Sequence, residues 1–203
     1  MNSSSEYLKF VNDFSRVLSD LTNNKCFSNI IFLCIGTDRV QGDSFGPLVG
    51  YKLNCLYKCT ENTEVIGDFN NLVCARNIQK VIEEIKNTYK NPFIIAIDSA
   101  LSKNNNTGEI IVSNKGIYIS NTTIGKCIYV GDMSIRGVVG QNTCNHKCNM
   151  QILQTIPLGT IMKMADITSN FINRTKEMHI NILIVDVEED YYSILSKCIV
   201  VNT

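Results

Sequence analysis

Histidine is scarce in this sequence of 203 residues, which contains only His146 and His179. The chain also lacks the Gly-x-Ser-x-Gly stretch of a nucleophile elbow. With only two histidines to act as the base, the sequence does not favour a serine or cysteine nucleophile. Neither the Gly-x4-Gly-Lys-Ser/Thr stretch of a P-loop nor the Gly-x-Gly-x-x-Gly stretch of a dinucleotide-binding turn occurs. These absences leave carboxylates as the main candidates for acid–base chemistry.

A surplus of positive charge is missing as well, because 19 Lys and Arg residues balance 19 Asp and Glu residues. A dedicated nucleic-acid-binding protein normally carries a basic surplus that neutralises phosphates, so we expect no nucleic-acid partner. No stretch reaches the roughly 18 uncharged apolar residues of a membrane span. Residues 1–6 lack the cationic start and apolar run of a secretory signal, so we expect a cytoplasmic protein without a membrane partner.

The nine cysteines do not indicate a disulfide framework, because their number is odd and the chain is long enough to bury a core. Cys34 and Cys74 lie in apolar or alanine-containing stretches, where a thiol usually behaves as a small hydrophobic group. Cys144, His146 and Cys148 do not form the Cys-x2-Cys pair of a zinc site. We interpret them as a polar turn and expect no metal or other cofactor.

The composition is that of a globular domain, with 44% hydrophobic and 19% charged residues. The length fits one α/β domain over residues 1–203. Apolar residues at helical spacing predict helices at residues 4–22, 47–57, 75–89 and 158–176. Apolar runs predict strands at 30–35, 63–66, 93–97 and 180–185, and weaker patterns predict a strand at 132–139 and an antiparallel excursion at 109–113 and 116–120.

This alternation predicts a three-layer α/β/α architecture, in which helices cover both faces of an open, twisted, mainly parallel sheet. In such sheets the functional site lies beyond the carboxyl ends of the strands. Asp38 and Asp43 follow the strand at 30–35, and Asp98 directly follows the strand at 93–97. Acidic side chains from both segments are therefore expected at one edge of the sheet.

Two neighbouring carboxyl groups can carry out acid–base chemistry on a peptide bond. Burial and a neighbouring like charge raise the pKa of one member, so the pair can share a proton. One carboxylate then activates a water molecule while the other group donates to the carbonyl, as in aspartic proteases. Asp43 and Asp98 are the candidate catalytic pair. In the structural alternative, Asp43 caps the helix near Pro47 and Asp98 caps a turn.

Two sequence blocks resemble the sporulation protein YyaC family. The first runs from Gly36-Thr37-Asp38-Arg39 through Gly42-Asp43-Ser44-Phe45-Gly46-Pro47, and the second is Ile95-Ala96-Ile97-Asp98-Ser99-Ala100. Segments 131–135 and 162–166 match the same family, so the resemblance covers about residues 29–169. The N-terminal helix and the segment from about Lys176 carry no matching motif.

The YyaC family is in turn similar to the spore germination protease, an atypical aspartic peptidase, and more distantly to hydrogenase maturation endopeptidases. The resemblance implies their phosphorylase/hydrolase-like fold and places the two acids of the germination protease on Asp43 and Asp98. In the maturation enzymes the equivalent acids bind nickel together with a histidine. No histidine lies near either motif in this sequence.

The remaining polar residues of the motifs are candidates for substrate binding or for shaping the loop. Asp38 and Arg39 are expected to form an internal ion pair, and Thr37 and Ser44 either orient the acids or serve the turn. Ser99 belongs to the same group. We expect Asp132 and Asp166 to cap or terminate elements, with Asp132 also a candidate for the cleft.

Three functions remain open from the sequence. The leading hypothesis is an aspartic-type endopeptidase of the germination-protease type, acting on a protein or peptide, such as small acid-soluble spore proteins, in a sporulating cell or spore core. A second is a non-catalytic module that binds a peptide or partner in the same cleft. A third is a metal-dependent hydrolase in which Asp43, Asp98 and His146 bind a divalent ion. The oligomeric state, a homo-oligomer included, is not determined by the sequence.

Overall fold

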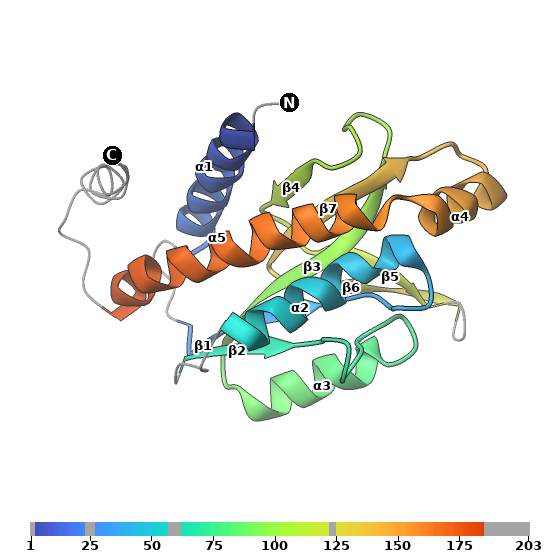
Figure 1. Ribbon diagram of the computed structural model, residues 1–203. Coiled ribbons are helices and arrows are strands. Elements are labelled where there is room, and N and C mark those ends of the chain that lie inside the picture. Colours follow the sequence, from blue (N-terminus) through green and yellow to red (C-terminus); the bar gives the residue numbers. More distant parts are fainter. Residues whose placement is uncertain (1–2, 23–26, 57–61, 122–124, 185–203) are drawn as a thin grey trace.

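The computed structural model describes residues 3–22, 27–56, 62–121 and 125–184 (Figure 1). The helices are α1 (Ser3–Thr22), the 3-10 helix η1 (Gln41–Ser44), α2 (Phe45–Leu56), α3 (Ile78–Thr88), α4 (His146–Thr155) and α5 (Leu158–Ile184). The strands are β1 (Asn29–Cys34), β2 (Thr63–Ile66), β3 (Pro92–Ser102), β4 (Ile110–Ser113), β5 (Ile117–Asn121), β6 (Lys126–Val130) and β7 (Met133–Gln141).

Five strands form the main sheet in the order β2-β1-β3-β7-β4. All neighbours are parallel except β4, which runs antiparallel to β7 at one edge. From β1 the chain adds β2 on one side and later β3 on the other, so the direction of winding changes between β1 and β3. In open α/β sheets such a switch point opens the crevice that holds the functional site.

Two apolar clusters sandwich the sheet. On one face, residues of α1, α2 and α5 pack on alternate residues of β1, β3 and β7, among them Phe93, Ile95 and Ile97. On the other face, α3 and the β5–β6 hairpin cover the intervening residues, among them Ile94 and Ala96. The layers can be followed in Figure 1. The predicted fold class is therefore confirmed, with a hairpin completing the second outer layer.

The predicted N-terminal helix is confirmed as α1. Phe10 and Phe14 recur four residues apart and both bury their rings against Phe171 of α5, with ring centroids 4.6 and 5.2 Å apart. Edge-to-face contacts of this kind add to the gain from burying the rings. The sequence from Lys163 to Ile184 contains no proline or glycine that would end a helix, and α5 accordingly continues to Ile184.

The prediction of a strand at 180–185 is wrong, because residues 180–184 form the last turns of α5, while residue 185 lies outside the described residues. A short apolar run does not distinguish a strand from a helix, and here the helix that precedes it simply continues. None of the described helices is long and apolar enough to cross a bilayer.

The predicted excursion at 109–113 and 116–120 consists of two strands that pair elsewhere. β4 lies antiparallel to β7, whereas β5 pairs with β6, which the sequence pattern did not predict. The strand predicted at 132–139 is confirmed as β7. Cross-strand partners are chosen by the tertiary fold, so adjacent strands in the sequence need not pair.

The stretch containing Cys144, His146 and Cys148 includes the start of α4, a helix that was not predicted. Asn145 caps this helix, because its side chain accepts hydrogen bonds from the backbone N–H groups of Lys147 and Cys148. Both cysteines and the histidine are exposed there.

Candidate active site

The loop after β1 folds back over the strand ends because two of its glycines allow very close backbone contacts. Gly36 has a φ of +150°, and a Cβ atom there would lie 2.0 Å from the carbonyl oxygen of Asp43. A Cβ atom on Gly46 would lie 2.1 Å from the Ile35 carbonyl oxygen and 2.8 Å from that of Ile97. Only glycine permits these contacts, which hold η1 and the start of α2 directly over the ends of β1 and the middle of β3.

Hydrogen bonds within the loop fix the backbone of Asp43. The Thr37 N–H donates to the Asp43 carbonyl over 3.0 Å, and the Asp43 N–H donates to the Val40 carbonyl over 2.9 Å. The Thr37 hydroxyl accepts from the Arg39 N–H, and the buried Ser44 hydroxyl donates to the Gln41 carbonyl. The side chains of Thr37 and Ser44 therefore bond to the loop backbone rather than to the carboxyl group of either acid.

Asp98 lies within β3 and not after it, which corrects the expectation that the strand ends at Ile97. β3 continues to Ser102, with an irregularity in its pairing to β7 between Ala100 and Leu101. The Asp98 carboxylate accepts from the Ser99 N–H over 2.8 Å. The Ser99 hydroxyl is 3.4 Å from the Asp43 carboxylate and donates to it. Ser99 thus touches both acids, although they are far apart in the sequence.

Both acids hold their protons more tightly than an ordinary aspartate. Burial raises the pKa of Asp98 to about 8, and repulsion from Asp43 adds to this, against the lowering effects of the Ser99 N–H and the Arg136 charge. Burial also raises the pKa of Asp43, against the lowering effect of the Ser99 hydroxyl. At neutral pH Asp98 is therefore protonated beside Asp43, which is the arrangement that shared-proton chemistry requires.

Arg136 is a charged residue of this site that sequence reasoning missed. It lies opposite Asp98 in the register between β3 and β7, and its charge acts on that carboxyl. The sequence did offer one sign of Arg136, because it is the single charged residue within the otherwise uncharged stretch 133–141. Because that stretch was predicted only weakly as a strand, its neighbour in the sheet was unknown.

Three residues that the sequence grouped with the site are placed otherwise. Asp132 precedes β7, where its carboxylate accepts from the Ile94 N–H and its own N–H donates to the Ile94 carbonyl. Ile94 lies four residues before Asp98 on β3, towards the amino end, so Asp132 does not join the pair. Asp38 and Arg39 are both exposed, and these two described residues form no ion pair with each other.

A metal centre does not fit the residues present. Among the described residues, no three His, Cys, Asp or Glu side chains gather as a metal site, so Asp43, Asp98 and His146 do not form the centre considered from the sequence. A nickel ion beside Asp43 and Asp98 would have two carboxyl groups as donors and would be repelled by the nearby charge of Arg136. A guanidinium has no lone pair to offer a metal ion.

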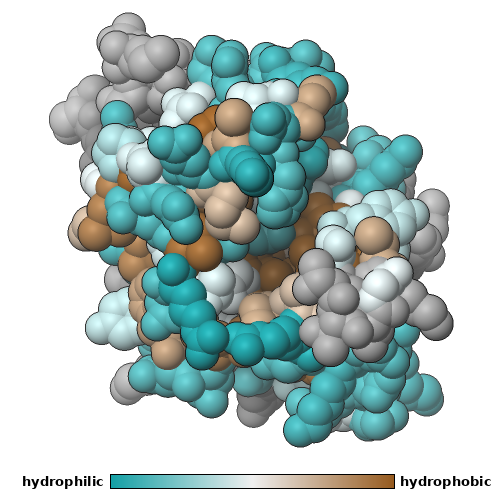
Figure 2. All heavy atoms as spheres, turned by 90° about the vertical axis from the view of Figure 1, so that its right-hand side faces the viewer, coloured by the Kyte–Doolittle hydropathy of each residue, from teal (hydrophilic) through white to brown (hydrophobic). Residues whose placement is uncertain are grey.

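The face formed by the carboxyl ends of the strands is hollowed. In Figure 1 β7 runs towards the right-hand side, and Figure 2 shows that side facing the viewer. Hydrophobic residues form the floor of the hollow, and hydrophilic residues surround much of its rim.

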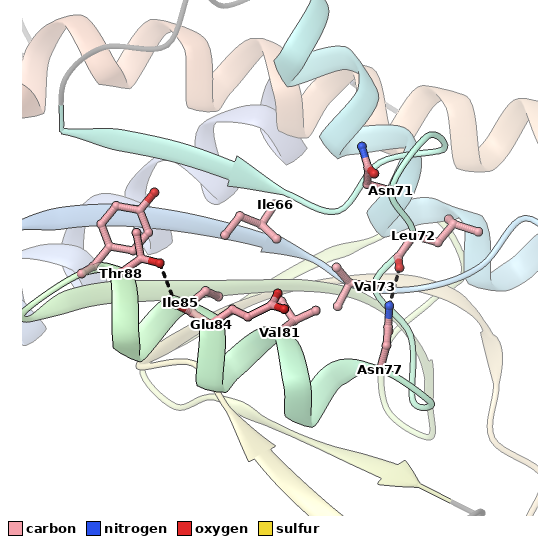
Figure 3. Close-up of a pocket in the computed structure, with 10 residues that line it drawn as sticks. Ile66, Asn71, Leu72, Val73, Asn77, Val81, Glu84, Ile85 and Thr88 are labelled. Atoms are coloured by element: carbon pink, nitrogen blue, oxygen red, sulfur yellow. Dashed lines mark hydrogen bonds between the residues drawn. The ribbon is translucent and has the colours of Figure 1, made fainter.

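A separate groove of about 360 Å³ lies between the end of β2, the segment at 71–73 and α3 (Figure 3). Half of its lining residues are aliphatic, and two of its polar side chains take part in local structure: the Asn77 amide donates to the Leu72 carbonyl and the Thr88 hydroxyl donates to the Glu84 carbonyl. Neither Asp43 nor Asp98 lines this groove. This groove is therefore not the candidate active site, because it lacks the two acids.

Comparison with known proteins places this chain in a family. The profile of the family described as "Protein of unknown function (DUF1256)" matches residues 2–171. The chain is 30% identical over 159 residues to the "Uncharacterized protein YyaC" of Bacillus subtilis (strain 168), covering 78% of this chain and 75% of that protein. Among solved structures, the NiFe hydrogenase maturation protease HycI from Thermococcus kodakarensis KOD1 is 16% identical, with a TM-score of 0.45, and the match covers 77% of this chain and 99% of that chain. The predicted relationship is confirmed: the protein belongs to the DUF1256 family and is a relative of YyaC.

Proposed function

We propose that this protein is an aspartic-type endopeptidase of the germination-protease type, in which Asp43 and Asp98 activate water against a peptide bond. The observation that carries the proposal is the meeting of two aspartates from separate segments, joined through Ser99, at the switch point of the sheet. The motif context of both acids, which resembles that of the spore germination protease, supports it.

The two acids have different roles in this mechanism. Asp98, with its pKa raised to about 8, is the proton donor at neutral pH, and Asp43 is the base. The Asp43 carboxylate takes a proton from water while the water oxygen forms a bond to the carbonyl carbon. The carbonyl π electrons move to the carbonyl oxygen, which receives the Asp98 proton.

Collapse of this tetrahedral intermediate completes the reaction. The C–N bond breaks, the leaving nitrogen takes the proton held by Asp43, and one hydroxyl proton returns to Asp98. Both acids regain their starting states, and the products are a carboxylic acid and an amine. Ser99 keeps the Asp43 carboxylate oriented through its hydroxyl. We infer that Asp38 and Arg39, whose side chains are exposed on the loop leading to Asp43, contact an extended peptide substrate.

The proposed substrates are small acid-soluble spore proteins in a sporulating cell or spore core. The test uses purified full-length protein, an acid-soluble protein extract of bacterial spores, and mass spectrometry to map the cleavage sites. Asp43→Asn and Asp98→Asn are each expected to lower the cleavage rate by about 1000-fold, because each removes one proton-transfer group. Asp20→Asn, an exposed aspartate on α1, is the matched control and should cleave at the wild-type rate.

Cleavage at the wild-type rate by either active-site variant would contradict the mechanism. If the wild-type protein binds spore proteins without cutting them and both variants bind equally well, the protein is the non-catalytic binding module instead. Dissociation constants from calorimetry, measured in parallel with the cleavage assay, separate these two results.

A further inference from the structure

Arg136 shares a face of the sheet with Asp98. The two residues are direct partners in the parallel pairing of β3 and β7, and on β4 the partner of Arg136 is Ile111. Side chains of paired residues point to the same side of a sheet. Ile94 and Ala96, which precede Asp98 at two-residue steps, lie in the cluster covered by α3 and the β5–β6 hairpin. Arg136 and Asp98 therefore continue this face towards the carboxyl edge.

The Arg136 guanidinium has an unused donor. Its Nε atom is buried, and within the described part of the chain the Nε–H has no hydrogen-bond acceptor. None of the ion pairs among the described residues includes Arg136 or Asp98, so the two residues are neighbours in the sheet without an ion pair between them. A buried N–H without an acceptor is unfavourable, and it is uncommon unless a ligand or a water completes it.

The Arg136 Nε–H stands near the place where the oxygen of the scissile carbonyl would lie. A substrate carbonyl that receives the Asp98 proton lies next to that carboxyl group, and Arg136 is the direct partner of Asp98 on the neighbouring strand. Negative charge develops on that oxygen as water attacks, and a fixed cationic donor stabilises it. An ionised Asp98 would compete with the substrate oxygen by forming an ion pair with the Arg136 guanidinium. The raised pKa of Asp98 keeps this carboxyl group neutral, so the guanidinium stays available.

We propose that Arg136 is the third group of the active site and that its Nε–H binds the oxygen of the scissile carbonyl beside Asp98. This inference rests on the proposed peptidase function. During attack, Arg136 donates a hydrogen bond to the carbonyl oxygen and keeps its proton, while Asp98 transfers its proton to the same oxygen. Arg136 stabilises the charge through the transition state and is unchanged at the end of the cycle.

The first test measures kinetics on a synthetic peptide that spans a cleavage site mapped in the spore-protein extract. Arg136→Met keeps much of the side-chain volume and removes the charge and the donor, so kcat should fall by about 100-fold with KM changed by less than about threefold. Arg136→Lys keeps the charge without the Nε–H and should retain intermediate activity. Arg76→Met, an exposed arginine before α3, is the control and should match the wild type.

The second test needs no substrate. Carbon-13 NMR of labelled aspartate carboxyl groups, with Asp98→Asn to assign the signal, follows the titration of Asp98 in each protein. The charged groups that act on Asp98 are Asp43 from η1 and Arg136 from β7. Loss of the cation in Arg136→Met should raise the Asp98 pKa above its wild-type value, and Arg136→Lys should restore part of the difference.

The outcomes separate this inference from the proposed function. If Asp43→Asn and Asp98→Asn lose activity but Arg136→Met keeps a kcat like that of Arg76→Met, the peptidase stands and the role of Arg136 is wrong. A fall in kcat that is accompanied by an unchanged Asp98 titration also overturns it, because Arg136 then acts from elsewhere. If Asp98→Asn cleaves like the wild type, the proposed function fails first.

Discussion

Asp68, which follows β2, and Asp98, which lies in β3, are two shielded aspartates that behave in opposite ways. Asp68 follows β2, is only 7% exposed and accepts hydrogen bonds from the side chain of Asn54 and from the backbone N–H groups of Asn70 and Asn71. Burial raises its pKa, but these donors lower it more, so the net pKa lies below the ordinary value. Asp98 is half-buried, accepts from the Ser99 N–H, and has its pKa raised to about 8.

The difference teaches that burial alone does not decide the charge of a carboxyl group. Asp68 exposes little of its surface and is nevertheless ionised, because three donors replace the water it lost. Asp98 has fewer donors and a second acid nearby, so it stays protonated at neutral pH. A carboxylate that accepts several hydrogen bonds stays ionised and stabilises its loop. A buried carboxyl group with few hydrogen-bond donors keeps a proton that it can transfer.

The largest expected effect that separates the two aspartates is on the pH dependence of cleavage. Because Asp98 must carry a proton, kcat/KM should fall tenfold per pH unit above its pKa, a loss of about 100-fold at about pH 10. Asp68→Asn should show the same decline, since Asp68 holds no proton in that range. Activity that stays level to about pH 10, after correction for unfolding by return to neutral pH, would contradict the assignment of Asp98 as the acid.

Replacing Asp68 should cost stability instead. Asp68→Asn removes the negative charge from three hydrogen bonds and sets an NH2 group against the Asn54 donor, so the free energy of unfolding should fall by about 2 kcal/mol at neutral pH. Because the folded-state pKa is lowered, the stabilising effect of wild-type Asp68 is present above about pH 4 and is lost as the pH falls further. Urea unfolding of both proteins between acid and neutral pH tests this, and an equal stability at neutral pH would contradict it.

Replacing Asp98 should have the opposite effect on stability. Because the folded-state pKa of Asp98 is raised, the contribution of protonated Asp98 to wild-type stability is fully present below about pH 4. This contribution is lost as the pH rises through about 8. Asp98→Asn cannot ionise, so it should become more stable than the wild type by at least about 1 kcal/mol at about pH 9, or about 2–4 °C in Tm. Thermal melts at acid and alkaline pH measure the difference, and a variant less stable than the wild type at alkaline pH would show that Asp98 is a structural anchor like Asp68.

The smallest expected effect concerns Ser99, which links the two acids. Ser99→Ala removes the donor to Asp43, whose pKa should then rise further, because that hydroxyl lowers it. The acid side of the pH–rate profile should move to higher pH, and kcat at neutral pH should fall by about threefold, as for a modest orienting hydrogen bond. Ser102→Ala, beyond the acids on the same strand, is the comparison. A profile of Ser99→Ala identical to the wild type would remove Ser99 from the site.

Local patterns were enough to predict the elements that are long and regularly spaced. The helix at 4–22, the strand at 63–66 and the buried start of β3 follow from apolar periodicity and are confirmed. The pattern failed where a neighbour decides the outcome. Ile180 to Ile184 continue a helix that already exists, and β5 pairs with β6 rather than with the nearby β4.

The site shows the same division. The motif glycines, Asp43 and Asp98 were predicted as one group, but the exposed Asp38 and Arg39 do not pair, and Asp132 bonds to Ile94 instead. Spacing along the chain carries no information about which side of a strand faces which neighbour. Ser99 was grouped with the motif residues without a defined contact, and its bonds to both acids appear only in three dimensions.

The sequence by itself determined the class of fold and put forward Asp43 and Asp98 as the candidate pair, since apolar periodicity and a motif are properties of neighbouring residues. The tertiary structure alone decided that Asp98 keeps its proton while Asp68 does not, and that Arg136 stands beside the acid pair. The physical reason is that a charge is set by the water removed and the donors supplied, and both come from segments far away in the chain.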